Sequence, residues 1–103
     1  MDGYVVLTFA FEKIDRRWTA HCKELGTATF GRSLTEAEKR LEEAVFLHLN
    51  TLEEVGERER FFKEHNIQFC YGEPTEDVTI CLPLRESAFV KPHVQLIPTL
   101  VAA

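Results

Sequence analysis

The feature that most constrains this fold is a long amphipathic segment near the middle of the chain. Its apolar residues recur at the spacing of one helix face, at Leu34, Ala37, Leu41, Ala44, Val45, Leu52 and Val55. Two overlapping pairs, Ser33 with Glu36 and Thr35 with Glu38, fit the capping box that starts a helix. Gly56 fits the left-handed position just past a helix end. The segment predicts a helix from about Ser33 to Val55, which must bury its apolar face against another layer.

The residues before this helix predict a three-stranded β-meander. From Tyr4 to Phe11 both faces of a strand would be largely apolar, so we expect this strand to lie centrally, covered on both sides. The polar run 12–17 predicts a hairpin loop, and residues 18–22 alternate as a second strand. A short third strand is expected at 27–30, ending at Gly31.

The residues after the long helix predict a short helix and further strands. We expect the second helix at 57–65 with Asn66 as its cap, and strands at 67–71 and 77–82 joined by a turn at 72–76. Pro83, Pro92 and Pro98 exclude the sites around them from a central position in a sheet. The apolar run 94–103 predicts an extended edge segment that docks on the same or a neighbouring subunit.

The predicted fold class is therefore α+β, with the order βββα, then a helix, then two or three short strands. The chain length of 103 residues is typical of one domain. We expect a single domain over residues 1–103, with a core at 4–55 and a C-terminal extension at 57–103. The apolar run near the start is too short to span a bilayer and has no basic residue before it. Three widely spaced cysteines favour a reduced, cytoplasmic chain.

The charge of the chain is unevenly distributed. Twelve basic and 17 acidic residues give a net charge of −5, which disfavours general binding to nucleic acid and favours a basic partner. Residues 33–65 hold nine of the acidic and five of the basic residues, so most of the excess negative charge lies on the predicted helices. This charge could equally form a solvated helix surface with pairs four residues apart.

The sequence offers no pattern for catalysis or metal binding. His21 and Cys22 are neighbours on a predicted strand, so their side chains point to opposite faces and cannot share a metal or form a nucleophilic pair. No histidine or cysteine pair has zinc-site spacing, and the chain has no phosphate-binding loop or nucleophile elbow. His48 falls where a packed, hydrogen-bonded core histidine is expected. We predict no catalytic residues, no metal and no cofactor.

Five sequence segments resemble the HicB-like antitoxin family. They cover a first strand, a strand ending in Cys-x-Glu-Leu-Gly, a Gly-x-Ser-Leu-x-Glu-Ala helix start and a long acidic helix. The residues are Val5-Val6-Leu7, Trp18-Thr19-Ala20-His21-Cys22, Lys23-Glu24-Leu25-Gly26, Gly31-Arg32-Ser33-Leu34-Thr35-Glu36-Ala37 and Leu41-Glu42-Glu43-Ala44-Val45. Residues 59–67 are similar to an extension in short members. The chain departs from the family motif in the turn, where Lys23 replaces a proline and Thr27 a cysteine.

The resemblance implies a three-stranded sheet backed by a long helix, in a partial RNase H-like fold. It also implies a non-catalytic antitoxin that binds a small basic RNA-cleaving HicA-type toxin and occludes its active site. Many members carry a C-terminal DNA-binding module, and the residues after Gly56 do not resemble one, so DNA binding is doubtful.

From the residues, we predict two sets of contact positions. The predicted partner-binding residues are Glu24, Glu36, Glu43 and Glu54. Phe46 and Leu49 lie off the main apolar stripe of the helix, which indicates a second covered face. The predicted oligomer-interface residues are Phe46, Leu49, Val94 and Leu96, in a homo-oligomer that is a dimer or a tetramer. Two alternatives stay open: a self-associating scaffold without a toxin partner, and a transcriptional regulator.

Overall fold

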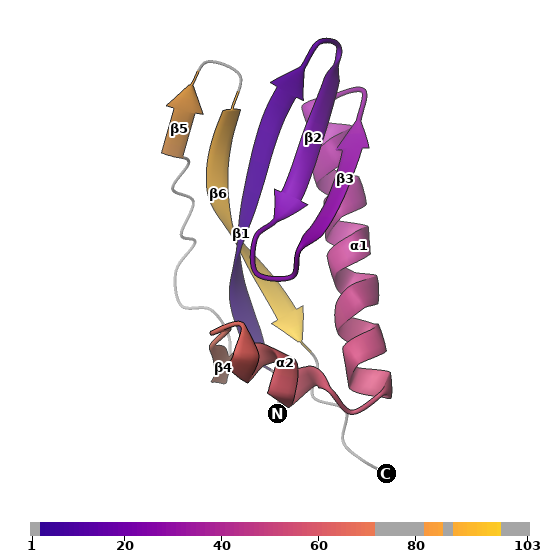
Figure 1. Ribbon diagram of the computed structural model, residues 1–103, viewed down its shortest axis with the longest axis vertical. Coiled ribbons are helices and arrows are strands. Elements are labelled where there is room, and N and C mark those ends of the chain that lie inside the picture. The colour runs from indigo at the N-terminus through magenta and orange to yellow at the C-terminus, as the bar shows by residue number, and fades with distance from the viewer. Residues whose placement is uncertain (1–2, 72–81, 86–87, 98–103) are drawn as a thin grey trace.

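The computed structural model describes residues 3–71, 82–85 and 88–97, with the backbone alone at 82–85. It has the predicted α+β architecture, in which a long helix packs on one face of an antiparallel sheet (Figure 1). The elements are β1 (Gly3–Ile14), β2 (Arg17–Cys22), β3 (Thr27–Gly31), α1 (Leu34–Glu54), α2 (Arg58–Glu64), β4 (Phe69–Tyr71), β5 (Leu82–Arg85) and β6 (Ala88–Ile97). The strand order is β3-β2-β1-β6-β5, and β4 pairs with the start of β1. The predicted turn at 72–76, the strand residues 77–81 and the tail 98–103 lie outside the described residues.

Strand β1 is central, as predicted. It pairs with β2 along one edge and with β6 along the other, where ten residues of each strand face one another. Alternate side chains of β1, at Val5, Leu7, Phe9 and Phe11, are at most 2 % exposed under α1. The cover expected on the second face of β1 is not found among the described residues, since Val6 there is 48 % exposed.

The buried face of α1 differs from the predicted stripe. The core residues of the helix recur every four positions, at Ala37, Leu41, Val45 and Leu49. Leu34 and Leu52 are partly buried at the margin of this core, and Val55 is largely exposed. The prediction that Leu49 lies off the main stripe was therefore wrong, because Leu49 continues the row of core residues and only 6 % of it is exposed. The predicted core and the predicted C-terminal extension form one buried cluster, to which the extension contributes Phe62, Ile67 and Ile97.

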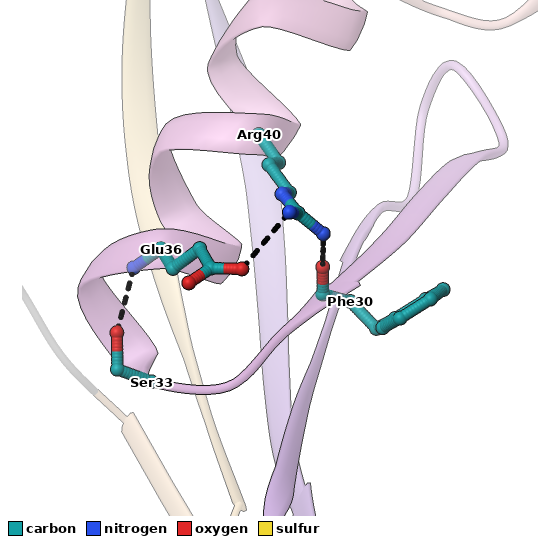
Figure 2. Close-up of polar contacts among 4 residues, drawn as sticks. All are labelled: Phe30, Ser33, Glu36 and Arg40. Carbon is teal, nitrogen blue, oxygen red and sulfur yellow. Dashed lines mark hydrogen bonds and ion pairs between the residues drawn. The ribbon is translucent and has the colours of Figure 1, made fainter.

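Helix α1 begins at the first of the two capping candidates. The Glu36 backbone N–H donates to Ser33 Oγ at 3.1 Å, which makes Ser33 the N-cap (Figure 2). The Glu36 carboxylate does not complete the capping box, since it pairs with Arg40 at 3.0 Å. The alternative box is wrong because Thr35 lies inside the helix and the Glu38 carboxylate pairs with Lys91.

Both helices end as their sequences predict. Gly56 has a φ of 70°, and the N–H of the following residue, Glu57, donates to the Leu52 carbonyl at 2.9 Å. Asn66 has a φ of 56° after α2, and the Ile67 N–H donates to the Phe62 carbonyl at 2.8 Å. Each is a Schellman arrangement, which occupies the last helix carbonyls and turns the chain sharply.

The β1–β2 connection is shorter than predicted. Residues 12–14 continue β1, and Ile14 lies opposite Arg17, so the turn contains Asp15 and Arg16 alone. Asp15 takes a φ of 58°, a conformation that aspartate tolerates in tight turns. Polar side chains did not end the strand because its backbone groups are paired with β2, and the side chains at 13–16 project into water.

Strand β6 is longer than the short C-terminal strands that the sequence predicts. It runs through Pro92, which lies opposite Thr8 of β1. The backbone groups of Thr8 bond on the β2 side, to the Glu24 carboxylate and the Lys23 N–H. Pro92 therefore occupies a non-hydrogen-bonded position toward β1, and its missing N–H costs this ladder nothing. Residues 94–97 of the predicted apolar edge segment pair with β1 of the same chain.

Candidate protein-binding groove

A groove runs between α1 and β6, and we call it the α1–β6 groove. One wall comes from α1 and the other from the last residues of β6. Its lining residues are Lys39, Glu42, Glu43, Phe46, His93, Val94, Gln95 and Leu96. Beyond Phe46 it continues into a second hollow lined also by Leu49, Asn50, Glu53, Arg58 and Ile97.

The groove and its rim have two large apolar side chains that the described residues leave exposed. Phe46 is 50 % exposed on the helix wall, and Leu96 is 59 % exposed at the rim of the groove, where it lies opposite Tyr4 and its side chain leaves the sheet on the side away from α1. Water contact at such side chains is unfavourable by roughly 25 cal/mol per Å² of apolar surface. A partner that inserts apolar side chains here gains that free energy, so the groove can bind a protein surface.

The helix wall of the groove is acidic. Glu42 and Glu43 are both exposed, while Lys39 is the one basic residue that α1 contributes to the lining. Neither carboxylate is engaged in an ion pair within the described part of the chain. This wall therefore offers negative charge beside an apolar surface, an arrangement that suits a partner with lysine or arginine around an apolar patch.

The strand wall is held in place by contacts to the core. The His93 ring stacks on Phe9, with ring centroids 4.2 Å apart and an angle of 12° between the planes. His93 Nε2 lies 3.1 Å from Gln95 Oε1. The neighbouring Lys91 forms an ion pair with Glu38 of α1, which ties the strand to the helix. A wall fixed in this way loses little conformational freedom on binding.

The four predicted partner-binding carboxylates do not form one site. Glu43 lies in the α1–β6 groove, and Glu54 is exposed at the last residue of α1. Glu36 pairs with Arg40, whose Nη1 also donates to the Phe30 carbonyl at 3.2 Å (Figure 2). These contacts join the start of α1 to the end of β3.

Glu24 is engaged in the fold. Its Oε1 accepts from the Thr8 backbone N–H at 2.7 Å, and its Oε2 accepts from the Thr8 hydroxyl at 2.8 Å. Strand β2 ends at Cys22, so its backbone offers no acceptor opposite Thr8. The Glu24 carboxylate takes the place of that acceptor on the edge of β1. This places Glu24 in a structural role, apart from the groove.

Three of the four predicted interface residues lie together. Phe46, Val94 and Leu96 line the groove, whereas Leu49 is part of the core and reaches the adjoining hollow. The prediction missed Glu42, although helical spacing was a usable signal. Lys39, Glu42, Phe46, Asn50 and Glu53 recur at three- and four-residue steps, which places them on one helix face. The contribution of His93 and Gln95 had no local signal, because it depends on how β6 pairs.

The histidines and cysteines have structural surroundings. As predicted, Cys22 and His21 lie on opposite faces of β2, and the structure shows that Cys22 is buried and His21 is exposed. Burial, and secondarily the nearby Glu24 carboxylate, raise the pKa of the Cys22 thiol above its ordinary value. His48 is partly buried, with Nδ1 3.2 Å from Thr27 Oγ1 and its ring edge against Phe61.

The described residues contain neither a metal-binding cluster nor a membrane-spanning helix. No three histidine, cysteine or carboxylate side chains converge on a common metal position within residues 3–71, 82–85 and 88–97. In the same part of the chain, neither helix is long and apolar enough to cross a membrane.

Comparison with known proteins identifies no relative of this chain. The chain matches no protein-family model, no curated protein and no solved structure.

Proposed function

We propose that this chain is a HicB-like antitoxin that acts in the cytoplasm. In this proposal it binds a small basic RNA-cleaving toxin of the HicA type and occludes the active site of that toxin, without chemistry of its own. Two features support it: the motif resemblance over residues 5–45 and the α+β fold, in which a meander is backed by a long helix. Fold alone does not specify function, so the proposal depends on the groove.

The observation that carries the proposal is the pairing of exposed apolar and acidic side chains in the α1–β6 groove. Phe46 supplies apolar surface, and Glu42 and Glu43 supply negative charge beside it, with no ion pair in the described part of the chain. A ribonuclease that binds the RNA backbone must present basic residues around its active site. Such a surface is complementary to this groove in charge, and the apolar side chains provide the short-range contact.

The two kinds of side chain have different roles in the proposed binding. The net charge of −5 attracts a basic toxin over long range, which raises the association rate and makes it fall with added salt. Burial of Phe46 then slows dissociation, because the complex must expose that ring again to separate. The bound antitoxin excludes RNA by covering the basic surface that RNA would occupy.

The experiment pairs this chain with any small basic protein that a reading frame adjacent to its own gene encodes. Co-expression should restore growth of cells that the neighbour alone arrests, and the two proteins should co-purify. We expect Glu42→Arg with Glu43→Arg to lower the association rate at least tenfold at low salt, and Phe46→Ala to raise the dissociation rate.

The matched control reverses two exposed carboxylates away from the groove. Glu54→Arg with Glu59→Arg changes the net charge by the same amount, so it tests general attraction without touching the groove. A toxin that co-purifies equally well with the groove variant and the wild type, or a chain that never rescues growth, would contradict the proposal. Equal slowing by both double variants would limit the role of the groove to general attraction and contradict its assignment as the binding site.

A second candidate function is a self-associating scaffold without a toxin partner. The observation that favours it is the apolar sheet face described below, which a scaffold and an antitoxin could both use. Growth rescue separates the two, because a scaffold would leave the arrest by the neighbouring protein unchanged.

A further inference from the structure

The sheet has a second face, opposite α1, which we call the open face. Side chains at even positions of β1 and β6 project from it, because alternate residues of a strand point to opposite sides. Over the central stretch of the two strands these are Tyr4, Val6, Thr8, Ala10, Val90, Pro92, Val94 and Leu96, and beyond Ala10 the row ends in Glu12, which lies opposite Ala88. Each β1 residue of this set lies opposite one from β6, so the eight form a continuous double row.

The open face is apolar and accessible. None of the eight residues carries a charge, although 28 % of the whole chain is charged. Val6 is 48 % exposed at the centre of the row and Leu96 is 59 % exposed near one end. Phe30 of β3, 52 % exposed, projects from the same side of the sheet. A contiguous surface of this kind on a small protein marks an interaction site.

We propose that the open face binds a second copy of this chain, with the strands of the two copies antiparallel. Two chains that each carry a net charge of −5 repel one another over most of their surface. Along the uncharged double row, two copies can approach each other without bringing like charges face to face. The carboxylates nearest to the row are Glu12 at its end and Glu24, which accepts from the Thr8 hydroxyl at one side, so the eight central residues themselves place no charge against a second copy.

The antiparallel direction follows from the charge at the two ends of the molecule. The β1–β2 turn and the start of α1 lie at one end, and the end of α1 and α2 lie at the other (Figure 1). Residues 12–17 and 30–40 at the first end contain six basic and four acidic side chains, whereas 50–65 at the second contain three basic and five acidic. Antiparallel copies bring each basic end beside the acidic end of its partner, and parallel copies bring like ends together.

The size of the face is sufficient for an association of moderate strength. With ~3.3 Å of rise per residue and ~4.8 Å between strands, β1, β2, β3 and β6 present roughly 500 Å² of sheet per copy. Two copies thus bury about 1,000 Å² in total, counting the sheet as a flat surface, which is the lower limit for a specific interface. Because Phe46, Glu42 and Glu43 project from α1 on the other side of the sheet, the dimer leaves the acidic wall of the groove accessible.

Sedimentation equilibrium of the purified chain tests the dimer. We expect a reversible monomer–dimer equilibrium, and Val6→Lys should raise its dissociation constant at least tenfold because each copy then buries a charge. Leu47→Lys is the matched control, since Leu47 is 63 % exposed on α1, away from the open face, and this variant should associate as the wild type does. Circular dichroism confirms that each variant is folded, and Val6→Thr provides a milder change that keeps a β-branched residue at the site.

Three results would overturn the proposal. One is a wild-type chain that stays monomeric at high concentration, and another is dissociation by Leu47→Lys but not by Val6→Lys. The third concerns direction, through a spin label at Arg16→Cys in a chain whose own cysteines are replaced. Antiparallel copies place the two labels at opposite ends, on the order of the 48 Å length of one chain, and a separation below half of that contradicts the arrangement. Toxin binding by Val6→Lys is measured separately, so failure of the dimer and failure of the antitoxin function are distinguishable.

Discussion

The contact between Glu24 and Thr8 provides a direct test of whether a predicted binding residue has a structural role. The Glu24 carboxylate accepts two hydrogen bonds from Thr8, at 2.7 Å from the backbone N–H and 2.8 Å from the hydroxyl. Glu24→Ala removes both acceptors and leaves the N–H of a central strand without its partner. A residue whose sole role is to contact a toxin would change stability little when replaced.

The expected loss follows from the nature of these two bonds. Hydrogen bonds to a charged group contribute about 1.5–3 kcal/mol each, and an orphaned backbone N–H costs about 1–3 kcal/mol. The Thr8 hydroxyl can turn toward water when its acceptor is gone, so the N–H dominates. We expect Glu24→Ala to lower the free energy of unfolding by about 2–3 kcal/mol, or the melting temperature by roughly 10 °C in a chain of this size. Glu24→Gln keeps one acceptor and should cost about 1 kcal/mol.

Urea denaturation followed by circular dichroism measures these differences. A double-mutant cycle with Thr8→Val isolates the hydroxyl bond, because the coupling between the two positions should exceed ~0.5 kcal/mol. Glu43→Ala is the control, since Glu43 is exposed and its replacement should stay within about 0.5 kcal/mol of the wild type. If Glu24→Ala is as stable as the control, or the cycle gives no coupling, the structural role assigned to Glu24 is wrong.

Four further predictions concern buried residues and the close contact between β3 and α1. Gly31→Ala should destabilise the chain by at least ~1–3 kcal/mol, because a Cβ at this position would lie 2.6 Å from the backbone N of Ala37; a melting temperature equal to that of the wild type would show that β3 and α1 can separate. Leu41→Ala should cost about 2–5 kcal/mol in denaturant unfolding, since Leu41 is fully buried under the sheet. Cys22 should react with iodoacetamide far more slowly than Cys70 in the folded chain, and mass spectrometry of the alkylated peptides measures the difference. Because burial raises the pKa of the Cys22 thiol above 9.0, its contribution to stability is complete below that pH and is lost as the pH rises through the folded-state value; Cys22→Ala should remove this part of the alkaline destabilisation.

Several features were predictable because their signals are local. The hydroxyl of Ser33 sits three residues before the amide that it caps, and Gly56 and Asn66 allow the left-handed backbone that ends each helix. The opposite orientation of His21 and Cys22 likewise follows from strand geometry alone. Such interactions join residues a few positions apart, so the sequence contains all the information that they need.

Other features depend on which distant segments meet. Residue spacing shows that a helix has an apolar face, but it does not decide between neighbouring positions at the margin of that face. Packing against Val5, Leu7 and Phe9 decided that Leu49 is buried and that Phe46 is exposed. The loop at Glu24 gave no sign that its carboxylate would reach the edge of β1, 16 residues away.

The sequence by itself determined the order of the elements, the ends of both helices and the acidic character of α1, because caps, periodicity and charge act over a few residues. The tertiary structure decided that β6 pairs along β1 and passes through Pro92 without loss of a ladder bond. That pairing places His93 and Gln95 on the α1 side of the sheet and Val94 and Leu96 on the other side, and so creates both the groove and the open face. Long-range strand pairing depends on the register of the whole sheet and on which strands compete to pair with each edge, and no local sequence pattern specifies either.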